Sequence, residues 1–173
     1  MFAGKTKELI HRIINEPHAQ AFKPVSDTRS RRGNIVTHDG LSFPATPLAS
    51  PRDIFSQLKK DTRIVAIDEA QFFGAKLIPA TRDLLKSGYR VIIAGLSVMY
   101  DGKPYPPIPE LMAQAEHGTK LTAECMQCGK RAAFHRRTAP TPRRITRPPL
   151  IGGAESYEAV CRTCFLKLST QKV

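Results

Sequence analysis

The chain has 173 residues, of which 41% are hydrophobic, and this is enough to bury a core and to form a main domain with a small appendage. Its 27 Lys and Arg residues against 15 Asp and Glu give a net charge of +12, which favours anionic partners such as nucleotide phosphates, nucleic acid or a membrane surface. Because no apolar run reaches the length of a membrane span and no secretion signal opens the chain, we expect a cytoplasmic protein that does not enter a membrane.

The chain opens on the second half of a phosphate-binding loop, Met1-Phe2-Ala3-Gly4-Lys5-Thr6. In the full pattern G-x-x-x-x-G-K-[ST], backbone N–H groups cradle a polyphosphate, the Lys reaches the β- and γ-phosphates, and the hydroxyl binds Mg²⁺. The opening Gly and the strand that delivers the loop are absent as written, and half a motif taken alone favours a surface Gly-Lys turn. We therefore expect either an incomplete phosphate-binding protein or a true start upstream of Met1.

The hydrophobic pattern predicts strands that alternate with helices. Leu9, Ile10, Ile13 and Ile14 stand at helical spacing and predict a helix that follows the loop and ends before Pro17. Beyond it we expect short strands within 19–26 and 34–38, a helix over 53–58, a strand over 63–67, a helix over 76–87 that Gly88 closes, and a strand over 90–96. This alternation is typical of an α/β fold with a parallel sheet covered on both faces.

Two carboxylates, Asp68 and Glu69, follow the short apolar run 64–67. Such a run is typical of a buried parallel strand, and ligands of open α/β sheets gather at the carboxyl ends of the strands. An Asp there can hold Mg²⁺, and an adjacent Glu can act as a base. Taken alone, the pair fits a helix N-cap equally well. The presence of Gly4-Lys5-Thr6 moves the balance towards a phosphate-binding site.

All four cysteines stand in two C-x-x-C pairs, Cys125 with Cys128 and Cys161 with Cys164. Two such pairs in a cytoplasmic chain predict a tetrahedral structural zinc site, and a disulfide or redox pair is the less favoured alternative. Residues 129–160 separate the pairs, and the Pro- and Arg-rich part of this segment predicts an extended excursion. A long loop tied at both ends to a metal is a candidate substrate lid.

A series of motifs in chain order resembles type II thymidine kinases, the zinc-containing, tetrameric, cytosolic family. The motifs are M-F-A-G-K-T (1–6), D-T-R (27–29), T-H-D-G (37–40), I-D-E-A-Q-F-F (67–73), A-G-L (94–96), K-L-T-A-x-C-x-x-C (120–128) and I-G-G-A-E-S-Y-E-x-V-C-x-x-C (151–164). The resemblance implies a P-loop NTPase-like sheet domain over 1–120, without its first strand, and a zinc-binding domain with a substrate lasso loop over 121–173. The implied reaction is phosphoryl transfer from ATP to the 5′-hydroxyl of thymidine, with Mg²⁺ and a structural Zn²⁺.

The resemblance also implies roles for individual residues. The catalytic residues are Glu69, as the base, with Arg29 and Lys5. The implied nucleotide site comprises Met1, Phe2, Ala3, Gly4, Lys5, Thr6, Asp68, Glu69, Ala70 and Gln71. The implied magnesium ligands are Thr6, Asp27 and Asp68. The implied thymidine contacts are Phe72, Leu96, Tyr100, His135, Leu150, Ile151, Gly152 and Tyr157.

Two departures from the family pattern bear on selectivity for thymidine. Ser97 stands where the family usually has Asp, and His135 stands where a Thr usually faces the thymine methyl group. Two other functions remain open: a nucleotide-binding kinase remnant without catalysis, and a zinc-ribbon protein that binds nucleic acid. The chain has no Trp, and its basic stretch has no interleaved aromatic residues to stack bases, so we do not expect a nucleic-acid partner.

Overall fold

The computed structural model describes residues 2–27, 33–138 and 156–170. The chain divides into two compact units. We call Gly4–Ser97 with Tyr105–His117 the sheet unit, and Met1–Ala3 with Val98–Pro104 and Gly118–Val173 the cysteine unit. The domain boundary expected between residues 120 and 121 stays a prediction.

A five-stranded sheet forms the centre of the sheet unit, in the order β2-β3-β1-β4-β5. Its strands are β1 (Ala19–Pro24), β2 (Asn34–Val36), β3 (Ser42–Leu48), β4 (Ile64–Ile67) and β5 (Arg90–Ile93). β1 pairs in parallel with both β3 and β4, β4 pairs in parallel with β5, and β2 is antiparallel to β3. The α/β fold predicted from the sequence is confirmed, with one antiparallel strand added at the edge.

The hydrophobic pattern did not predict β3, because Pro44 and Pro47 lie within it. Proline cannot donate a backbone hydrogen bond and is rare inside a sheet. The strand nevertheless pairs on both sides, with Asn34 opposite Pro44 and Lys23 opposite Pro47. Tertiary pairing has therefore overridden the local preference.

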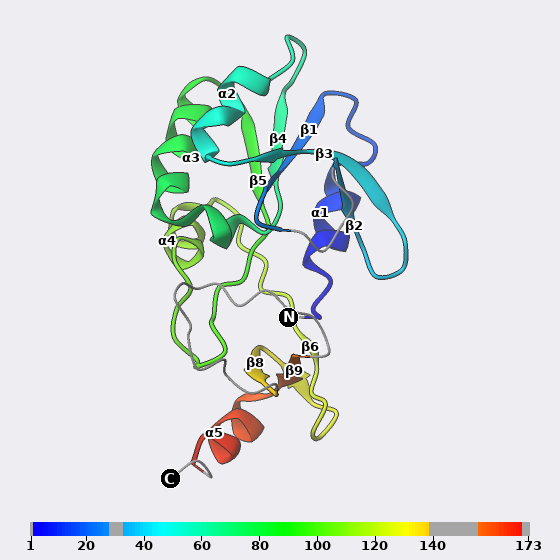
Figure 1. Ribbon diagram of the computed structural model, residues 1–173, viewed down its shortest axis with the longest axis vertical. Helices are drawn as coiled ribbons and strands as arrows, with labels where there is room; N and C mark the ends of the chain where they lie inside the picture. Colours follow the sequence, from blue (N-terminus) through cyan, green and yellow to red (C-terminus); the bar gives the residue numbers. More distant parts are fainter. Residues whose placement is uncertain (1, 28–32, 139–155, 171–173) are drawn as a thin grey trace. The chain divides into compact units, whose positions relative to one another are not determined.

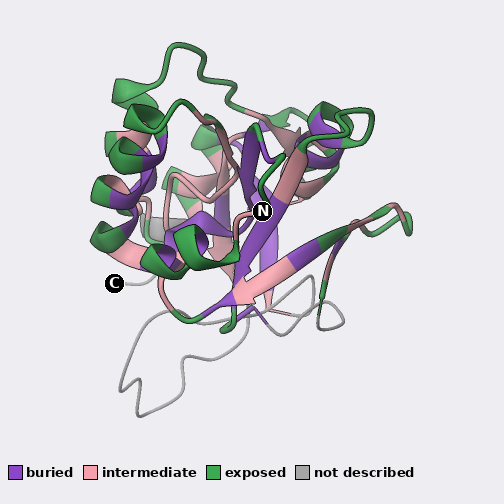
Figure 2. Ribbon diagram, turned by 90° about the horizontal axis from the view of Figure 1, so that it is seen from above, coloured by how far each residue is buried: buried purple, intermediate pink, exposed green. Residues whose placement is uncertain are grey.

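Helices cover both faces of this sheet (Figure 1). One face carries α1 (Lys5–Ile13), whose Leu9, Ile10 and Ile13 are buried against the strands. The opposite face carries η1 (Pro51–Asp53), α2 (Ile54–Gln57), η2 (Ala70–Lys76), α3 (Leu77–Lys86) and α4 (Ile108–Gln114). In Figure 2 the inward sides of the helices and much of the central strands β1 and β4 are buried, while the outer sides of the helices and parts of β3 are exposed. The helices predicted near 5–14, 53–58 and 76–87 are confirmed.

Gly88 ends α3 as its position in the sequence predicts. It has φ 85°, in the left-handed region that glycine adopts without strain. The Gly88 N–H donates to Leu85 O at 3.0 Å, and the Tyr89 N–H donates to Leu84 O at 3.1 Å. These two bonds form a Schellman motif, which satisfies carbonyls at the end of the helix and directs the chain into β5.

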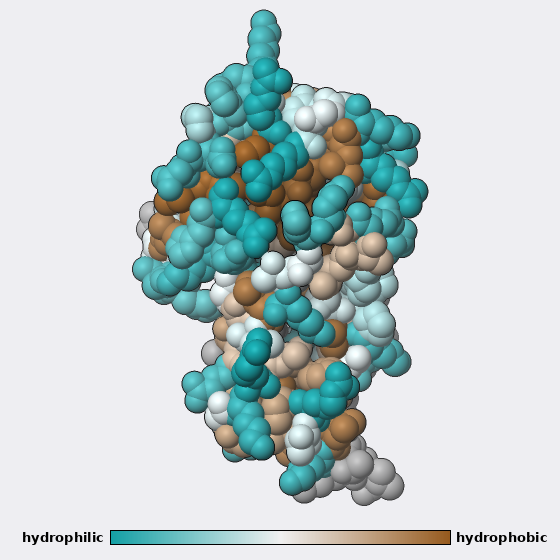
Figure 3. Space-filling model, turned by 180° about the vertical axis from the view of Figure 1, so that it is seen from behind, coloured by the Kyte–Doolittle hydropathy of each residue, from teal (hydrophilic) through white to brown (hydrophobic). Residues whose placement is uncertain are grey.

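β5 is less covered than β4. All four residues of β4 are buried, whereas Val91, Ile92 and Ile93 are only partly buried. Figure 3 shows apolar side chains among hydrophilic ones on one face of the sheet unit. None of the helices in the described ranges is both long and apolar enough to cross a bilayer.

The cysteine unit is built from short antiparallel pairs and one helix. β6 (Ala123–Glu124) pairs with β7 (Arg131–Ala132), β8 (Phe134–Arg137) pairs with β9 (Tyr157–Val160), and α5 (Arg162–Thr170) follows. Its small core contains Cys125, Ala132, Ala159, Val160 and Cys161, with Phe2, Phe134 and Phe165 packed against it. A core of this size buries little apolar surface, and small domains of this kind usually need a metal or disulfide for stability.

Candidate functional site

The start of α1 and the end of β4 meet at the carboxyl edge of the sheet. Gly4, with φ 71° and ψ 26°, turns the chain into α1, and the next two residues are Lys5 and Thr6. The Thr6 hydroxyl donates a hydrogen bond to Asp68 Oδ2 at 2.9 Å. The structure therefore brings the predicted half-motif and the predicted strand-end carboxylate together.

Asp68 is buried, and its surroundings oppose ionisation. Burial raises the pKa of this carboxyl group to about 6, and the charge of Glu69 adds to the rise. The Thr6 hydroxyl, the Glu69 N–H and the Lys5 ammonium group act in the opposite direction. A divalent cation would offset the free-energy cost of burying the ionised carboxylate. Hydroxyl and carboxylate oxygens are also ligands that Mg²⁺ accepts. Thr6 and Asp68 together therefore fit a magnesium ion.

Glu69 adopts a backbone conformation that is rare for residues other than glycine. It has φ 47° and ψ 38°, and its side chain is buried. Such a conformation costs about 1 to 3 kcal/mol and persists only when neighbouring contacts hold it. Here the Ala70 N–H donates to Ala94 O at 3.0 Å, and the Phe72 N–H donates to Glu69 O at 3.1 Å. Strain of this kind concentrates at functional sites.

Gln71 contacts Glu69 directly. Its Nε2 donates to Glu69 Oε2 at 2.6 Å, and its Oε1 accepts the backbone N–H of Leu96 at 3.0 Å. The side chain is only 2% exposed. The sequence predicted nucleotide binding for Gln71 and Ala70, and that role stays a prediction. The contact between Gln71 and the carboxylate could not be read from the sequence.

The other predicted residues of the sheet unit lie near these elements. Asp27 is buried in the turn after β1, where its N–H donates to Pro24 O at 3.0 Å. Phe72 and Leu96 are partly buried, at the start of η2 and after β5. Five predicted residues lie outside the described part of the chain: Met1, Arg29, Leu150, Ile151 and Gly152. Phe2 and Ala3 belong to the cysteine unit.

The sequence analysis missed Lys23. This residue is 1% exposed, and it follows Phe22, whose carbonyl accepts the Asp68 N–H at 3.0 Å. Lysine is almost never fully buried unless it is paired. The signal in the sequence is the single charged residue of the strand A-Q-A-F-K-P, directly after an apolar Phe.

The four cysteines converge in the cysteine unit. Their sulfur atoms all lie within 4.8 Å of one another, and the sulfurs of Cys128 and Cys161 are 3.7 Å apart. Tetrahedral zinc with Zn–S bonds of about 2.3 Å separates its sulfurs by about 3.8 Å, whereas a disulfide bond is about 2.05 Å long. All four thiols are free. The cluster therefore suggests a zinc site and does not support the disulfide alternative.

The thiols influence one another strongly. Burial opposes ionisation of Cys125, but the backbone N–H groups of Cys161 and Gln127 lower its pKa to about 6. The thiols of Cys128 and Cys161, in contrast, raise the pKa of Cys164 to about 12. Four thiolates repel one another unless a cation lies among them. A bound divalent metal removes this repulsion.

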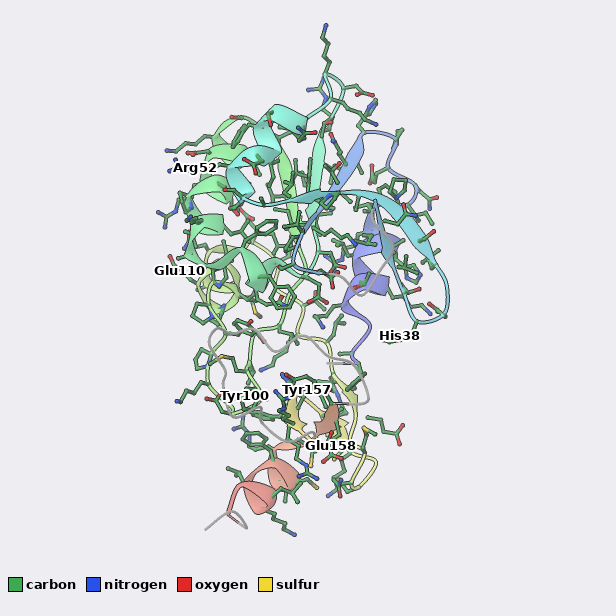
Figure 4. All side chains as sticks on the ribbon, in the orientation of Figure 1. His38, Arg52, Tyr100, Glu110, Tyr157 and Glu158 are labelled. Atoms are coloured by element: carbon green, nitrogen blue, oxygen red, sulfur yellow. The ribbon has the colours of Figure 1, made fainter. Side chains whose placement is uncertain are left out.

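Three predicted thymidine contacts lie together in the cysteine unit. The rings of His135 on β8 and Tyr157 on β9 meet edge to face, with centroids 5.7 Å apart. The guanidinium of Arg137 lies 6.0 Å from the Tyr157 ring centre. Burial raises the pKa of Tyr157, Arg137 lowers it, and the neighbouring Tyr100 adds to the rise. Figure 4 shows Tyr100 beside Tyr157.

The next residue on β9 points the other way and links the strands to the first cysteine pair (Figure 4). Glu158 lies opposite Arg136 and forms an ion pair with it. Gln127, between Cys125 and Cys128, donates from Nε2 to Glu158 Oε2 at 3.0 Å. The backbone adds a bond from the Met126 N–H to Ala159 O at 3.0 Å. The cysteine cluster and the strand that carries Tyr157 are thus joined by side-chain and backbone contacts.

Comparison with known proteins found matches to this sequence. A sequence model of the thymidine kinase family matches residues 1–165. A thymidine kinase of Bdellovibrio bacteriovorus is 42% identical over 169 residues, which cover 95% of this chain and 81% of that protein.

Proposed function

Because this chain belongs to the thymidine kinase family, whose reaction is the transfer of phosphate from ATP to thymidine, we propose that the carboxyl edge of the sheet carries this reaction. The single observation that best supports the proposal is the 2.9 Å contact between Thr6 and Asp68, directly beside Glu69. Membership of this family also favours kinase activity over the alternative function of a zinc-ribbon protein, the binding of nucleic acid.

Thr6 and Asp68 would hold Mg²⁺, which supplies charge neutralisation on the phosphates when bound. Asp27 is the further carboxylate that the family resemblance adds to this group. Lys5, at the first position of α1, would pair with the phosphates, which the N-terminus of the helix also attracts. The resemblance gives Arg29, outside the described residues, a second positive charge for the transferred group.

Glu69 is our candidate for the general base. As the 5′-oxygen of thymidine bonds to the γ-phosphorus, its proton passes to the Glu69 carboxylate. The bond between the γ-phosphorus and the bridging oxygen breaks, and ADP leaves. The buried position and the constrained backbone of Glu69 support this role, because a base must be held in one orientation.

We infer roles in thymidine binding from the family resemblance. The resemblance gives this role to Phe72, Leu96, Tyr100, His135 and Tyr157. The four cysteines would bind one structural Zn²⁺ with no open position for water. A cytoplasmic homotetramer is the assembly and location that the resemblance implies.

Replacement of the base tests the proposal. Glu69→Gln should lower kcat by about two to four orders of magnitude, while thymidine binding measured by calorimetry is retained. Glu116→Gln, at an exposed carboxylate of the same unit, is the matched control and should keep full activity. A kcat for Glu69→Gln within a few-fold of the parent would show that another group takes the proton.

A further inference from the structure

Gln71 lies between two parts of the sheet edge that are distant in sequence. Its amide contacts Glu69, two residues earlier, and Leu96, which follows β5. A second bond, from the Ala70 N–H to Ala94 O, runs beside it. The turn that contains Glu69 is therefore attached to the segment after β5 by one side-chain bond and one backbone bond.

The chemistry of the two partners sets the orientation of the amide. The backbone N–H of Leu96 can only donate, so it requires Oε1 of Gln71. The opposite end of the amide is then Nε2, which donates to Glu69 Oε2. An ionised carboxylate can only accept, so both contacts agree with one orientation and disagree with the flipped one.

Packing holds the amide in place from the other side. A Cβ atom at Gly95 would lie 2.6 Å from Ile108 Cδ1 and 3.0 Å from Gln71 Oε1. There is no room for a side chain at residue 95 unless Ile108 or Gln71 moves. The absence of a side chain at Gly95 therefore lets α4 and the amide of Gln71 approach the same stretch of backbone.

We propose that Gln71 is a positioning residue for phosphoryl transfer, which fixes the Glu69 carboxylate relative to the end of β5. This inference rests on the proposed role of Glu69 as the base. Both ends of the Gln71 amide contact the protein itself, so this role replaces the nucleotide contact that the resemblance implies. Gln71 acts through Glu69, and its removal changes the orientation of the base while the nucleotide contacts of other residues stay in place. A misplaced catalytic group can cost up to about 100-fold in rate.

A double-mutant cycle tests the inference. Gln71→Leu should lower kcat about 10- to 100-fold, with the KM values for ATP and thymidine changed less than about three-fold. In the Glu69→Gln background, the same substitution should change kcat less than about three-fold, because the base is already absent. Gln114→Leu, at an exposed glutamine of the sheet unit, is the control and should leave all constants unchanged.

A second variant protects the test against misfolding. Gln71→Met keeps the length and approximate volume of the side chain but offers no donor to Glu69. It should reproduce the loss of kcat, while calorimetric binding of ATP and thymidine is retained and shows that the protein is folded. Equal losses from Gln71→Leu with and without Glu69, or an unchanged kcat in both Gln71 variants, would overturn the positioning role. If Glu69→Gln itself keeps kcat, the proposed base is wrong, and the positioning role fails with it.

Discussion

The Thr6 hydroxyl and Asp68 Oδ2 are 2.9 Å apart, although the two residues stand 62 positions apart in the chain. Taken one at a time, the two sequence motifs do not identify the site, since a Gly-Lys turn is the favoured explanation of the first and a helix N-cap explains the second equally well. Their contact places a hydroxyl and a carboxylate at one edge of the sheet, which is the arrangement that a magnesium–nucleotide site requires. The charge state of Asp68 is therefore central to the site.

We predict that Asp68 makes the ligand-free protein less stable as the pH rises from about 4 to about 6. Its pKa is raised from 3.8 to about 6, so the folded state binds a proton that the unfolded state has released in this window. The shift corresponds to about 3 kcal/mol. The unfolding free energy of Asp68→Asn, minus that of the parent, should therefore grow across this range in denaturant titrations. The cysteine thiols are common to both proteins, and a constant difference would contradict the prediction.

Removal of the metal should weaken thymidine binding more than ATP binding. Cys161 directly follows β9, which carries Tyr157, whereas Thr6 and Asp68 belong to the other unit. We expect one zinc ion per chain in the parent and loss of it in Cys161→Ser. Met126→Ala is the control. It changes an exposed side chain between Cys125 and Cys128 and keeps the hydrogen bond from the backbone N–H of residue 126 to Ala159 O. A parent protein that contains no zinc would refute the metal site. A Cys161→Ser variant that binds thymidine as tightly as the parent would refute the role of the metal.

Glu158→Gln should lower the unfolding free energy of the cysteine unit by about 1 to 3 kcal/mol. The substitution removes a largely buried carboxylate that accepts hydrogen bonds from both Arg136 and Gln127. Thermal unfolding would measure the loss, and a chelator competition would show faster release of the metal. The double variant with Arg136→Gln should lose less than the sum of the two single variants. Strict additivity would mean that the ion pair contributes nothing.

Gly95→Ala should lower kcat by disturbing Gln71. The added methyl group must displace Ile108 or the Gln71 oxygen, and either movement loosens the contact with Glu69. Steady-state kinetics should show a lower kcat, with a melting temperature that falls only slightly. The double variant Gly95→Ala with Ile108→Val tests the cause, since it frees space on the Ile108 side. A kcat that does not recover at all would assign the effect directly to the amide.

Local signals were sufficient for several parts of the structure. Helical spacing predicted α1, the apolar run predicted β4, and Gly88 predicted the end of α3, because each depends on neighbouring residues alone. The two C-x-x-C pairs predicted the cysteine cluster, since this spacing lets both thiolates of a pair reach one tetrahedral zinc ion.

Other features depended on the tertiary structure. The prolines of β3 argue against a strand, and only pairing with β1 and β2 makes that segment extended. Glu69, which Gln71 contacts, adopts a left-handed conformation although it is not glycine, and no local preference predicts this. The sequence by itself predicted the helices α1, α2 and α3, the strands β4 and β5, and the cysteine pairs, because local patterns identify them. Only packing and strand register, which join residues far apart in the chain, decided how these groups meet.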